Sequence, residues 1–195
     1  MTAIHFSPWI GDDYEKANLY GKRILILGES HYGKEQGNIS ETTSLVIKEA
    51  EFQKLYTTRF LRMVPPAVLG YSYADAVTHQ QRKDFWNNVM FYNYIQESVN
   101  TGRGKRTKKQ WQNSIDAFFE VINTHKPEII FVFGVGIGNN LSRKNAESKN
   151  INGLRAVEYT LEGGGKSIAV VVRHPSGGMS YKEVHNVIEK LNLKR

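Results

Sequence analysis

Cysteine is absent from this chain of 195 residues. Its absence excludes disulfide bonds, a cysteine nucleophile, cysteine-based zinc sites and an iron–sulfur cluster held by cysteine. The six histidines are scattered, and none of them forms the H-x-H or H-E-x-x-H spacing of metal ligands. We therefore expect neither a metal site nor any other cofactor.

Long apolar runs are missing as well. No segment approaches the roughly 18 apolar residues that a membrane-spanning helix requires, so we expect no membrane partner. The first residues contain neither a basic cluster nor a long apolar stretch, which predicts a cytoplasmic protein without a signal peptide. Internal repeats and low-complexity linkers are also absent, and the length predicts a single, monomeric domain over residues 1–195.

Acidic residues are fewer than basic ones, 19 against 26, and the net charge is +7 with a pI near 9.5. Such a balance favours a polyanionic partner such as DNA, although a solvated basic surface explains it equally well. Five cations fall within residues 103–109, with no aromatic residue among them. This segment predicts phosphate contacts rather than base reading; the alternative is an ordinary solvated helix start.

Short apolar runs alternate with amphipathic stretches along the chain. Buried strands are predicted at residues 23–27, 129–133, 154–161 and 167–172. Helices are predicted at residues 40–61, 108–125 and 180–191. Pro65 and Pro66 are expected to end the first helical region, and the aromatic stretch 84–93 fits either element type. The alternation predicts an α/β fold, with three α/β/α layers around a central, mainly parallel four-stranded sheet.

Two polar loops follow two of the predicted strands, and ligands of open α/β sheets bind at strand ends. The first is Gly28-Glu29-Ser30-His31-Tyr32-Gly33, where Glu29 and Ser30 can orient a water and Tyr32 offers a stacking face. The second contains His174, which can donate a hydrogen bond to a developing negative charge. An ordinary turn and a surface histidine are the plainer interpretations of the two loops.

A third stretch, Phe91-Tyr92-Asn93-Tyr94, places a carboxamide among aromatic rings. An amide presents both a donor and an acceptor to a base edge, and aromatic rings stack on bases. Core packing by Phe91, with Asn93 in a turn, is the alternative. The glycines at 134, 136 and 138 do not match the G-x-G-x-x-G spacing, so we infer no nicotinamide cofactor.

These segments together resemble the uracil-DNA glycosylase superfamily. Members carry a water-activating loop after the first strand, and residues 28–33 are similar to it. A middle motif ends a strand with an asparagine that reads the pyrimidine edge, and the stretch that ends at Asn93 is similar to it. A terminal His-Pro-Ser loop is matched by His174-Pro175-Ser176. The resemblance covers roughly residues 20–35, 85–97 and 125–190, and leaves an unmatched, helical insertion at about 37–80.

The resemblance implies a DNA glycosylase that flips out a modified or damaged pyrimidine and hydrolyses its N-glycosidic bond, leaving an abasic site. His174 would stabilise the departing base, while Glu29 or Ser30 would position the water. The base would be held by Asn93, Tyr32, Phe91 and Tyr92. DNA would be held by Ser176, Gly177, Gly178, Arg103, Lys105, Arg106 and Lys108, with Met179 as a wedge.

Several positions depart from the family pattern. Ser30 stands where many members have a catalytic aspartate, His31 replaces a proline, and Met179 comes one residue later than the usual wedge. These departures indicate a pocket for a base other than plain uracil, such as a hypermodified phage base. Excision of a phage base would make the protein an antiviral defence enzyme, and excision of uracil or a damaged base would make it a DNA repair enzyme.

Two other functions fit parts of the pattern. A serine esterase would use Ser30 and His174, but Val171 stands where its orienting carboxylate belongs. A non-catalytic DNA-binding module on the same fold would explain the missing aspartate and would show salt-sensitive binding without an abasic product.

Overall fold

The computed structural model describes residues 3–32, 39–52, 58–72, 75–99 and 106–194. Within them the strands are β1 (Trp9–Ile10), β2 (Ile24–Gly28), β3 (Val89–Asn93), β4 (Ile129–Phe133), β5 (Ala146–Ile151), β6 (Leu154–Thr160) and β7 (Lys166–Val172). The helices are α1 (Thr42–Phe52), α2 (Arg59–Val68), α3 (His79–Asn87), α4 (Lys108–Asn113), α5 (Ile115–His125), α6 (Val135–Asn140) and α7 (Tyr181–Lys190). Short 3₁₀ turns are η1 (Tyr14–Lys16), η2 (Ile39–Glu41) and η3 (Pro175–Gly177).

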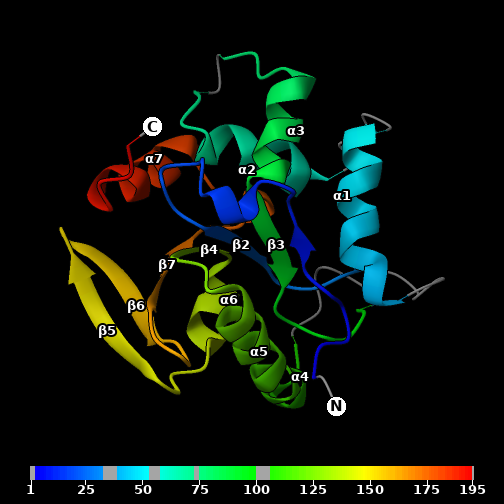
Figure 1. The fold of residues 1–195 in the computed structure, drawn as a ribbon, viewed down its shortest axis with the longest axis vertical. Coiled ribbons are helices and arrows are strands. Elements are labelled where there is room, and N and C mark those ends of the chain that lie inside the picture. The colour runs from blue at the N-terminus through cyan, green and yellow to red at the C-terminus, as the bar shows by residue number, and fades with distance from the viewer. Residues whose placement is uncertain (1–2, 33–38, 53–57, 73–74, 100–105, 195) are drawn as a thin grey trace.

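The strands form one sheet in the order β1-β3-β2-β4-β7-β6-β5. Four neighbouring strands, β3, β2, β4 and β7, run parallel, while β1 at one edge and the β5–β6 hairpin at the other run antiparallel (Figure 1). The α/β class is therefore confirmed. The expected count of four strands was wrong, because the described residues form seven. The polar edge strand β5 and the two-residue strand β1 carry too little apolar pattern to be recognised.

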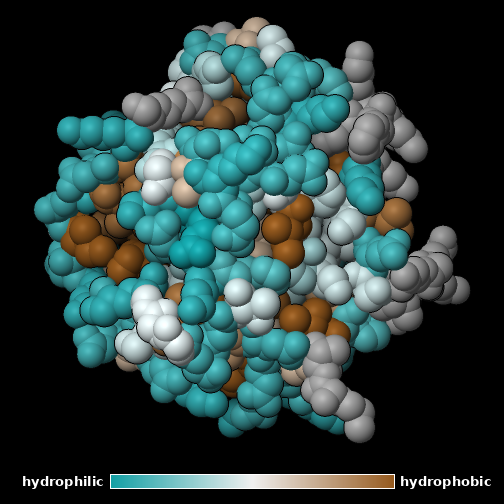
Figure 2. Space-filling model, viewed as in Figure 1, coloured by the Kyte–Doolittle hydropathy of each residue, from teal (hydrophilic) through white to brown (hydrophobic). Residues whose placement is uncertain are grey.

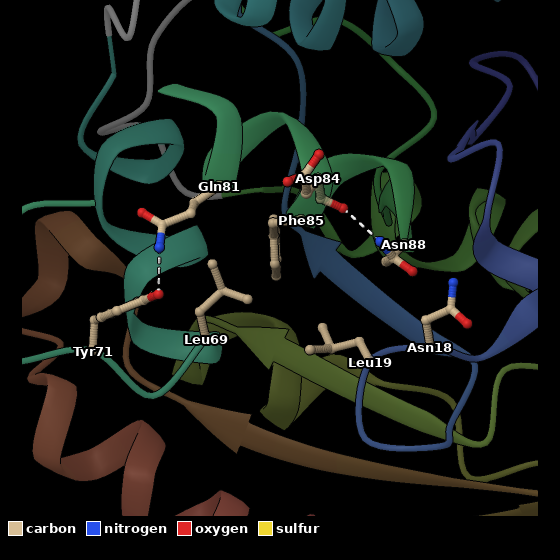
Figure 3. A pocket seen from close by; sticks show the side chains of 8 residues that line it. All are labelled: Asn18, Leu19, Leu69, Tyr71, Gln81, Asp84, Phe85 and Asn88. Atoms are coloured by element: carbon tan, nitrogen blue, oxygen red, sulfur yellow. Dashed lines mark hydrogen bonds between the residues drawn. The ribbon is translucent and has the colours of Figure 1, made fainter. Parts of the chain in front are cut away.

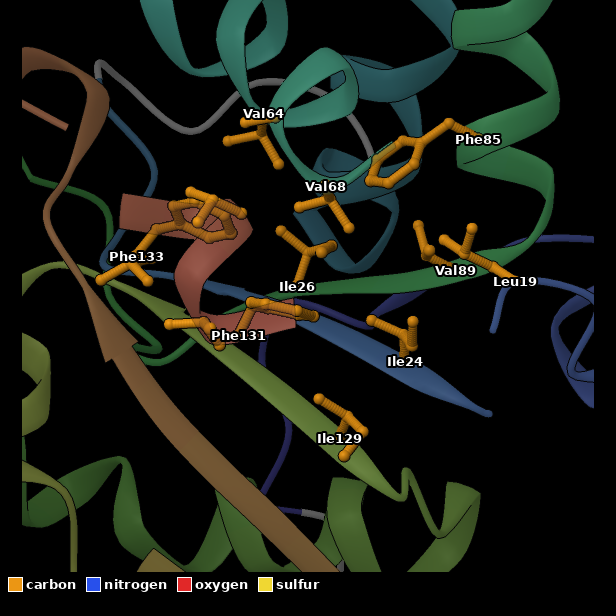
Figure 4. Close-up of a cluster of buried hydrophobic side chains, with 14 of the residues drawn as sticks. Leu19, Ile24, Ile26, Val64, Val68, Phe85, Val89, Ile129, Phe131 and Phe133 are labelled. Carbon is orange, nitrogen blue, oxygen red and sulfur yellow. The ribbon is translucent and has the colours of Figure 1, made fainter. Parts of the chain in front are cut away.

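Helices cover both faces of the sheet, as three layers require. Alternate strand residues point to opposite faces, so Ile24 and Ile26 pack under α2, α3 and α7, whereas Leu25 and Leu27 pack against α5 and α6. Figure 4 shows the first of these two cores, with Phe131 and Phe133 of β4 beneath Val64 and Val68 of α2. Burial on both faces explains why the parallel strands are continuous apolar runs rather than alternating ones.

Helix α2 continues through Pro65 and Pro66 to Val68, so the expectation that these prolines end the helical region was wrong. A proline inside a helix removes a backbone N–H and leaves the carbonyl one turn earlier without its partner. The Arg82 guanidinium of α3 donates to one such carbonyl, that of Arg62, at 2.7 Å. This contact between α3 and α2 supplies a partner for the carbonyl that Pro66 leaves without one.

The predicted helix at 108–125 is divided into α4 and α5 at Ser114. The Ser114 hydroxyl donates to the carbonyl of Gln110 at 2.9 Å and accepts from the amide of Gln96 at 3.1 Å. A serine that bonds back to the preceding turn bends or interrupts a helix. Across the described part of the chain, no helix is long and apolar enough to span a bilayer.

Candidate active site

The two polar loops and the asparagine meet at the carboxyl edge of the parallel strands. Gly28 at the end of β2 is in register with Asn93 at the end of β3, and β4 ends beside β7. The pairing continues beyond the strands, because Ile95 donates its amide to the carbonyl of Glu29 at 2.8 Å. Glu29, Asn93 and His174 therefore lie at one edge of the sheet, contributed by three strands.

The His174 imidazole is held by its own loop. Its Nδ1 accepts the backbone N–H of Ser176 at 3.1 Å and lies 2.6 Å from the Ser176 hydroxyl. A backbone amide only donates, so Nδ1 must be the unprotonated nitrogen. The neutral ring consequently carries its proton on Nε2, as a hydrogen-bond donor directed away from the turn.

The surroundings of His174 favour that neutral state. Burial lowers the pKa of the imidazole, and the nearby Glu29 carboxylate opposes this only in part. One face of the ring stacks on Phe60 of α2, with centroids 5.8 Å apart and planes at 27°. Phe60 in turn contacts Phe91 at 5.4 Å and Phe133 at 5.6 Å. His174 therefore lies over an aromatic cluster rather than free in solvent.

Glu29 is paired with a cation. Its Oε1 accepts from the Arg106 guanidinium at 2.8 Å, and the Arg106 side chain is only 5% exposed. Its Oε2 lies beside Gly136 of α6, 3.7 Å from where a Cβ would stand. The sequence pattern assigned Arg106 to phosphate contacts, and in the structure its guanidinium is paired with Glu29. The ion pair with this buried guanidinium fixes the orientation of the Glu29 carboxylate.

The Asn93 amide is also engaged. Its Oδ1 occupies the space beside Gly28, only 2.2 Å from an ideal Cβ built on that glycine. Its Nδ2 lies 3.2 Å from Nε2 and 3.3 Å from Nδ1 of His31. Asn93 is thus buried against His31, and a base could approach its amide nitrogen only after the imidazole has moved aside.

His31 links this site to helix α1. Its Nε2 lies 3.0 Å from the Thr43 hydroxyl, and its ring meets Phe6 edge-on at 4.8 Å. Burial lowers the pKa of His31 to about 4, so the ring is neutral at physiological pH. A neutral imidazole can accept from the Asn93 amide without placing a charge in the core.

The remaining predicted base contacts are divided between surface and core. Tyr32 is exposed, and the Arg106 guanidinium lies 6.0 Å from its ring centroid. Phe91 is buried against Phe60, which leaves little of its face for a base. Tyr92 is fully buried on the opposite face of the sheet, and burial raises its pKa, so its assignment to the base pocket was wrong. The hydroxyl of Ser30 is buried and has no hydrogen-bond partner among the described atoms.

The predicted DNA contacts have mixed outcomes. Ser176, Gly177 and Gly178 form an exposed turn, and Lys108 is exposed at the start of α4. Met179 is only 4% exposed and belongs to the core beneath α2 and α7, so its assignment as a wedge was wrong. The Met179 amide donates to the carbonyl of His174, and the turn closed by this hydrogen bond directs the Met179 side chain into the core. Gly33, Arg103 and Lys105 lie outside the described residues.

Sequence reasoning missed two contributors from the unmatched segment, Phe60 and Thr43. Each lies on a helix that packs over the sheet edge, Phe60 against His174 and Thr43 against His31. No local motif marks either residue. Their roles arise from tertiary packing of α1 and α2 on the strands.

A cavity of about 200 Å³ lies at the opposite, amino-terminal end of β2 and β3 (Figure 3). It is lined by Asn18, Leu19, Leu69, Tyr71, Gln81, Asp84, Phe85 and Asn88. Gln81 donates to the Tyr71 hydroxyl at 2.6 Å, so part of this polar lining is satisfied internally. The cavity shares no residue with the His174 site, and the described residues contain no group of three or more potential metal ligands.

The surface seen in Figure 2 is mainly hydrophilic, with hydrophobic residues emerging in separate spots. Tyr32 and Val135 are among the exposed large hydrophobic residues, and they follow β2 and β4 at the carboxyl edge. The sequence matches no model of a known protein family, and a comparison with curated proteins finds no significant match.

Proposed function

We propose that the protein is a DNA glycosylase that hydrolyses the N-glycosidic bond of a flipped, modified or damaged pyrimidine. The observation that carries the proposal is the state of His174, a half-buried imidazole whose Nδ1 accepts from Ser176, which leaves the proton of the neutral ring on Nε2 as a donor. Cleavage of an N-glycosidic bond leaves negative charge on the departing base, and a fixed donor stabilises such charge. A fixed donor of this kind contributes about 10²–10³ in rate.

Glu29 supplies the second part of the mechanism. Positive charge develops on the sugar as the bond breaks, and a carboxylate beside the sugar stabilises it and orients the attacking water. The Arg106 contact at Oε1 leaves Oε2 as the oxygen for this task. Ser30, whose buried hydroxyl has no hydrogen-bond partner in the described part of the chain, is a further group that could hold the water if the loop opens.

The kind of substrate is inferred from the contact that buries the Asn93 amide against His31. The family pattern assigns the base edge to this amide, but His31 occupies its nitrogen side. A base therefore binds only with displacement of His31, or in a different orientation above the Phe60 cluster. Either route favours a pyrimidine of unusual shape over plain uracil, and a phage-modified base is the specific hypothesis. The enzyme would work in the cytoplasm on DNA and without a cofactor.

The contact of the Asn93 amide with His31 also favours a second candidate, a non-catalytic DNA-binding module. Both candidates predict that Lys108→Ala weakens DNA binding and lowers its salt dependence by about one phosphate contact. Only the enzyme predicts abasic product. The esterase alternative loses support, because the hydroxyl beside His174 is that of Ser176 and the Ser30 hydroxyl has no hydrogen-bond partner among the described residues.

The test is release of base from duplex and single-stranded DNA carrying uracil, other deaminated pyrimidines or phage-modified pyrimidines. We expect abasic sites with at least one substrate, a loss of about 10²-fold or more in His174→Ala, and unchanged DNA affinity. His79→Gln at the start of α3 is the control. No product from any substrate, with DNA binding retained, would leave the binding module as the function.

A further inference from the structure

We infer that Phe60 of helix α2 is a positioning residue for His174, holding the plane of the imidazole from which Nε2 donates. The inference rests on the proposed function and adds a residue from the segment that has no counterpart in the glycosylase pattern.

Phe60 contacts two aromatic side chains of the sheet in addition to His174. Its ring contacts Phe91, which belongs to β3, at 5.4 Å with planes at 38°. It meets Phe133, the last residue of β4, edge-on at 5.6 Å. Strands β3 and β4 therefore determine where the Phe60 ring lies. Aromatic contacts in this range add to the area buried and restrict ring orientation.

The Phe60 ring also stacks on the imidazole of His174. The two rings are 5.8 Å apart and close to parallel, at 27°. Helix α2 begins next to this contact, at an N-cap where the Thr58 side chain accepts from the amide of Leu61. Because the cap fixes the first turn of α2, Phe60 has little freedom to follow a moving imidazole.

Phe60 and Ser176 restrain different motions of His174. Ser176 occupies Nδ1 and so determines which nitrogen points outward. It does not prevent the ring from tilting about that hydrogen bond. Stacking on Phe60 opposes the tilt, and it also keeps water from one face of the ring. The two contacts together specify both the identity and the direction of the donor.

The charged groups that act on His174 or neighbour the contact along the chain lie outside the Phe60 ring. Glu29 follows β2 and acts on the ring electrostatically. Arg59 and Arg62 flank Phe60 on α2 and are exposed. Arg173 precedes His174 and is paired with Glu183 of α7. Replacing Phe60 alters none of these charges, so any change in the titration of His174 reports the loss of the stacked ring.

The experiment is NMR of the imidazole of His174 in the full-length protein without DNA. In the wild type we expect contacts between protons of the Phe60 and His174 rings; their absence would overturn the inference without any variant. In Phe60→Leu we expect the His174 pKa to rise toward 6.5, because water reaches the exposed face. Phe60→Tyr should retain the wild-type titration, and Phe118→Leu, in the opposite core, should leave it unchanged. An unaltered titration in Phe60→Leu would refute the positioning role.

Base release provides the second readout. If the proposed function holds, Phe60→Leu should lower kcat by about 10–10²-fold, because a misplaced catalytic group is costly, with KM changed by less than about threefold. Phe60→Tyr should recover most of the activity. A changed titration together with a wild type that releases no base would refute the glycosylase and leave the positioning of His174 standing. A normal kcat in Phe60→Leu would refute the positioning role and leave the glycosylase standing.

Discussion

Gly28 and Asn93 are neighbours in register on β2 and β3, and the Asn93 side chain fills the space that any side chain on Gly28 would need. An ideal Cβ on Gly28 would come within 2.2 Å of Asn93 Oδ1 and 3.3 Å of Phe91. Glycine is needed at this position because the Asn93 amide approaches closely, and not because the backbone has an unusual φ angle. The pair connects the loop proposed to position the water with the residue proposed to bind the base.

Gly28→Ala is therefore expected to displace Asn93 and destabilise the fold by about 1–3 kcal/mol, as overpacking of a dense core does. Chemical denaturation would measure the change in the free energy of unfolding. Gly177→Ala is the matched control, because its Cβ would meet only an ordinary contact at 3.7 Å from His174. Equal stability of the two variants would contradict the close packing of Asn93 on Gly28.

Much of the fold is readable from the sequence because burial on both faces makes the central strands distinctive. The apolar runs at β2, β4 and β7 and the Ser180 cap of α7 carry strong local signals. Strand β3 directly follows α3, and its aromatic residues suit either element. Strand β5 is polar because it forms an edge, so its pairing depends on β6 rather than on its own pattern.

The candidate site is only half readable for a different reason. Residues at strand ends, such as Glu29 and His174, are placed by topology, which the sequence pattern indicates. The direction of a side chain is decided by packing. Met179 turns inward, Tyr92 faces the other core and Arg106 is paired with Glu29. No spacing rule distinguishes these outcomes from exposed, ligand-facing positions.

The buried His31 makes stability depend on pH. Its pKa is about 4 in the folded protein and about 6.5 when unfolded, so the unfolded chain binds more protons between these values. Its contribution to stability is fully present above about pH 6.5 and is lost as the pH falls toward 4, by about 3 kcal/mol in total. His31→Gln should flatten the dependence in part, since burial of His174 acts in the same direction.

Thr43→Val separates the hydrogen bond of His31 from its titration. This variant should lower stability at every pH, because the imidazole loses its hydroxyl partner, yet it should keep the slope between pH 7 and pH 4. Unfolding free energies measured across that range would decide. A steep slope retained in His31→Gln would show that His31 is not the group responsible, and a slope lost in Thr43→Val would show that the hydrogen bond and the titration of His31 are not separable.

The last prediction concerns the proton on His174. Ser176→Ala removes the hydroxyl that lies 2.6 Å from Nδ1 but keeps the backbone N–H that Nδ1 accepts. The neutral ring should therefore remain protonated on Nε2, which nitrogen-15 chemical shifts report directly, and base release should fall by less than about tenfold. In both proteins activity should form a plateau at neutral pH and decline as the pH falls through the lowered pKa of His174, because protonation at Nδ1 breaks the amide contact and charges the ring. A plateau that instead declines above pH 7, or a wild-type ring protonated on Nδ1, would mean that a group other than this imidazole donates to the departing base.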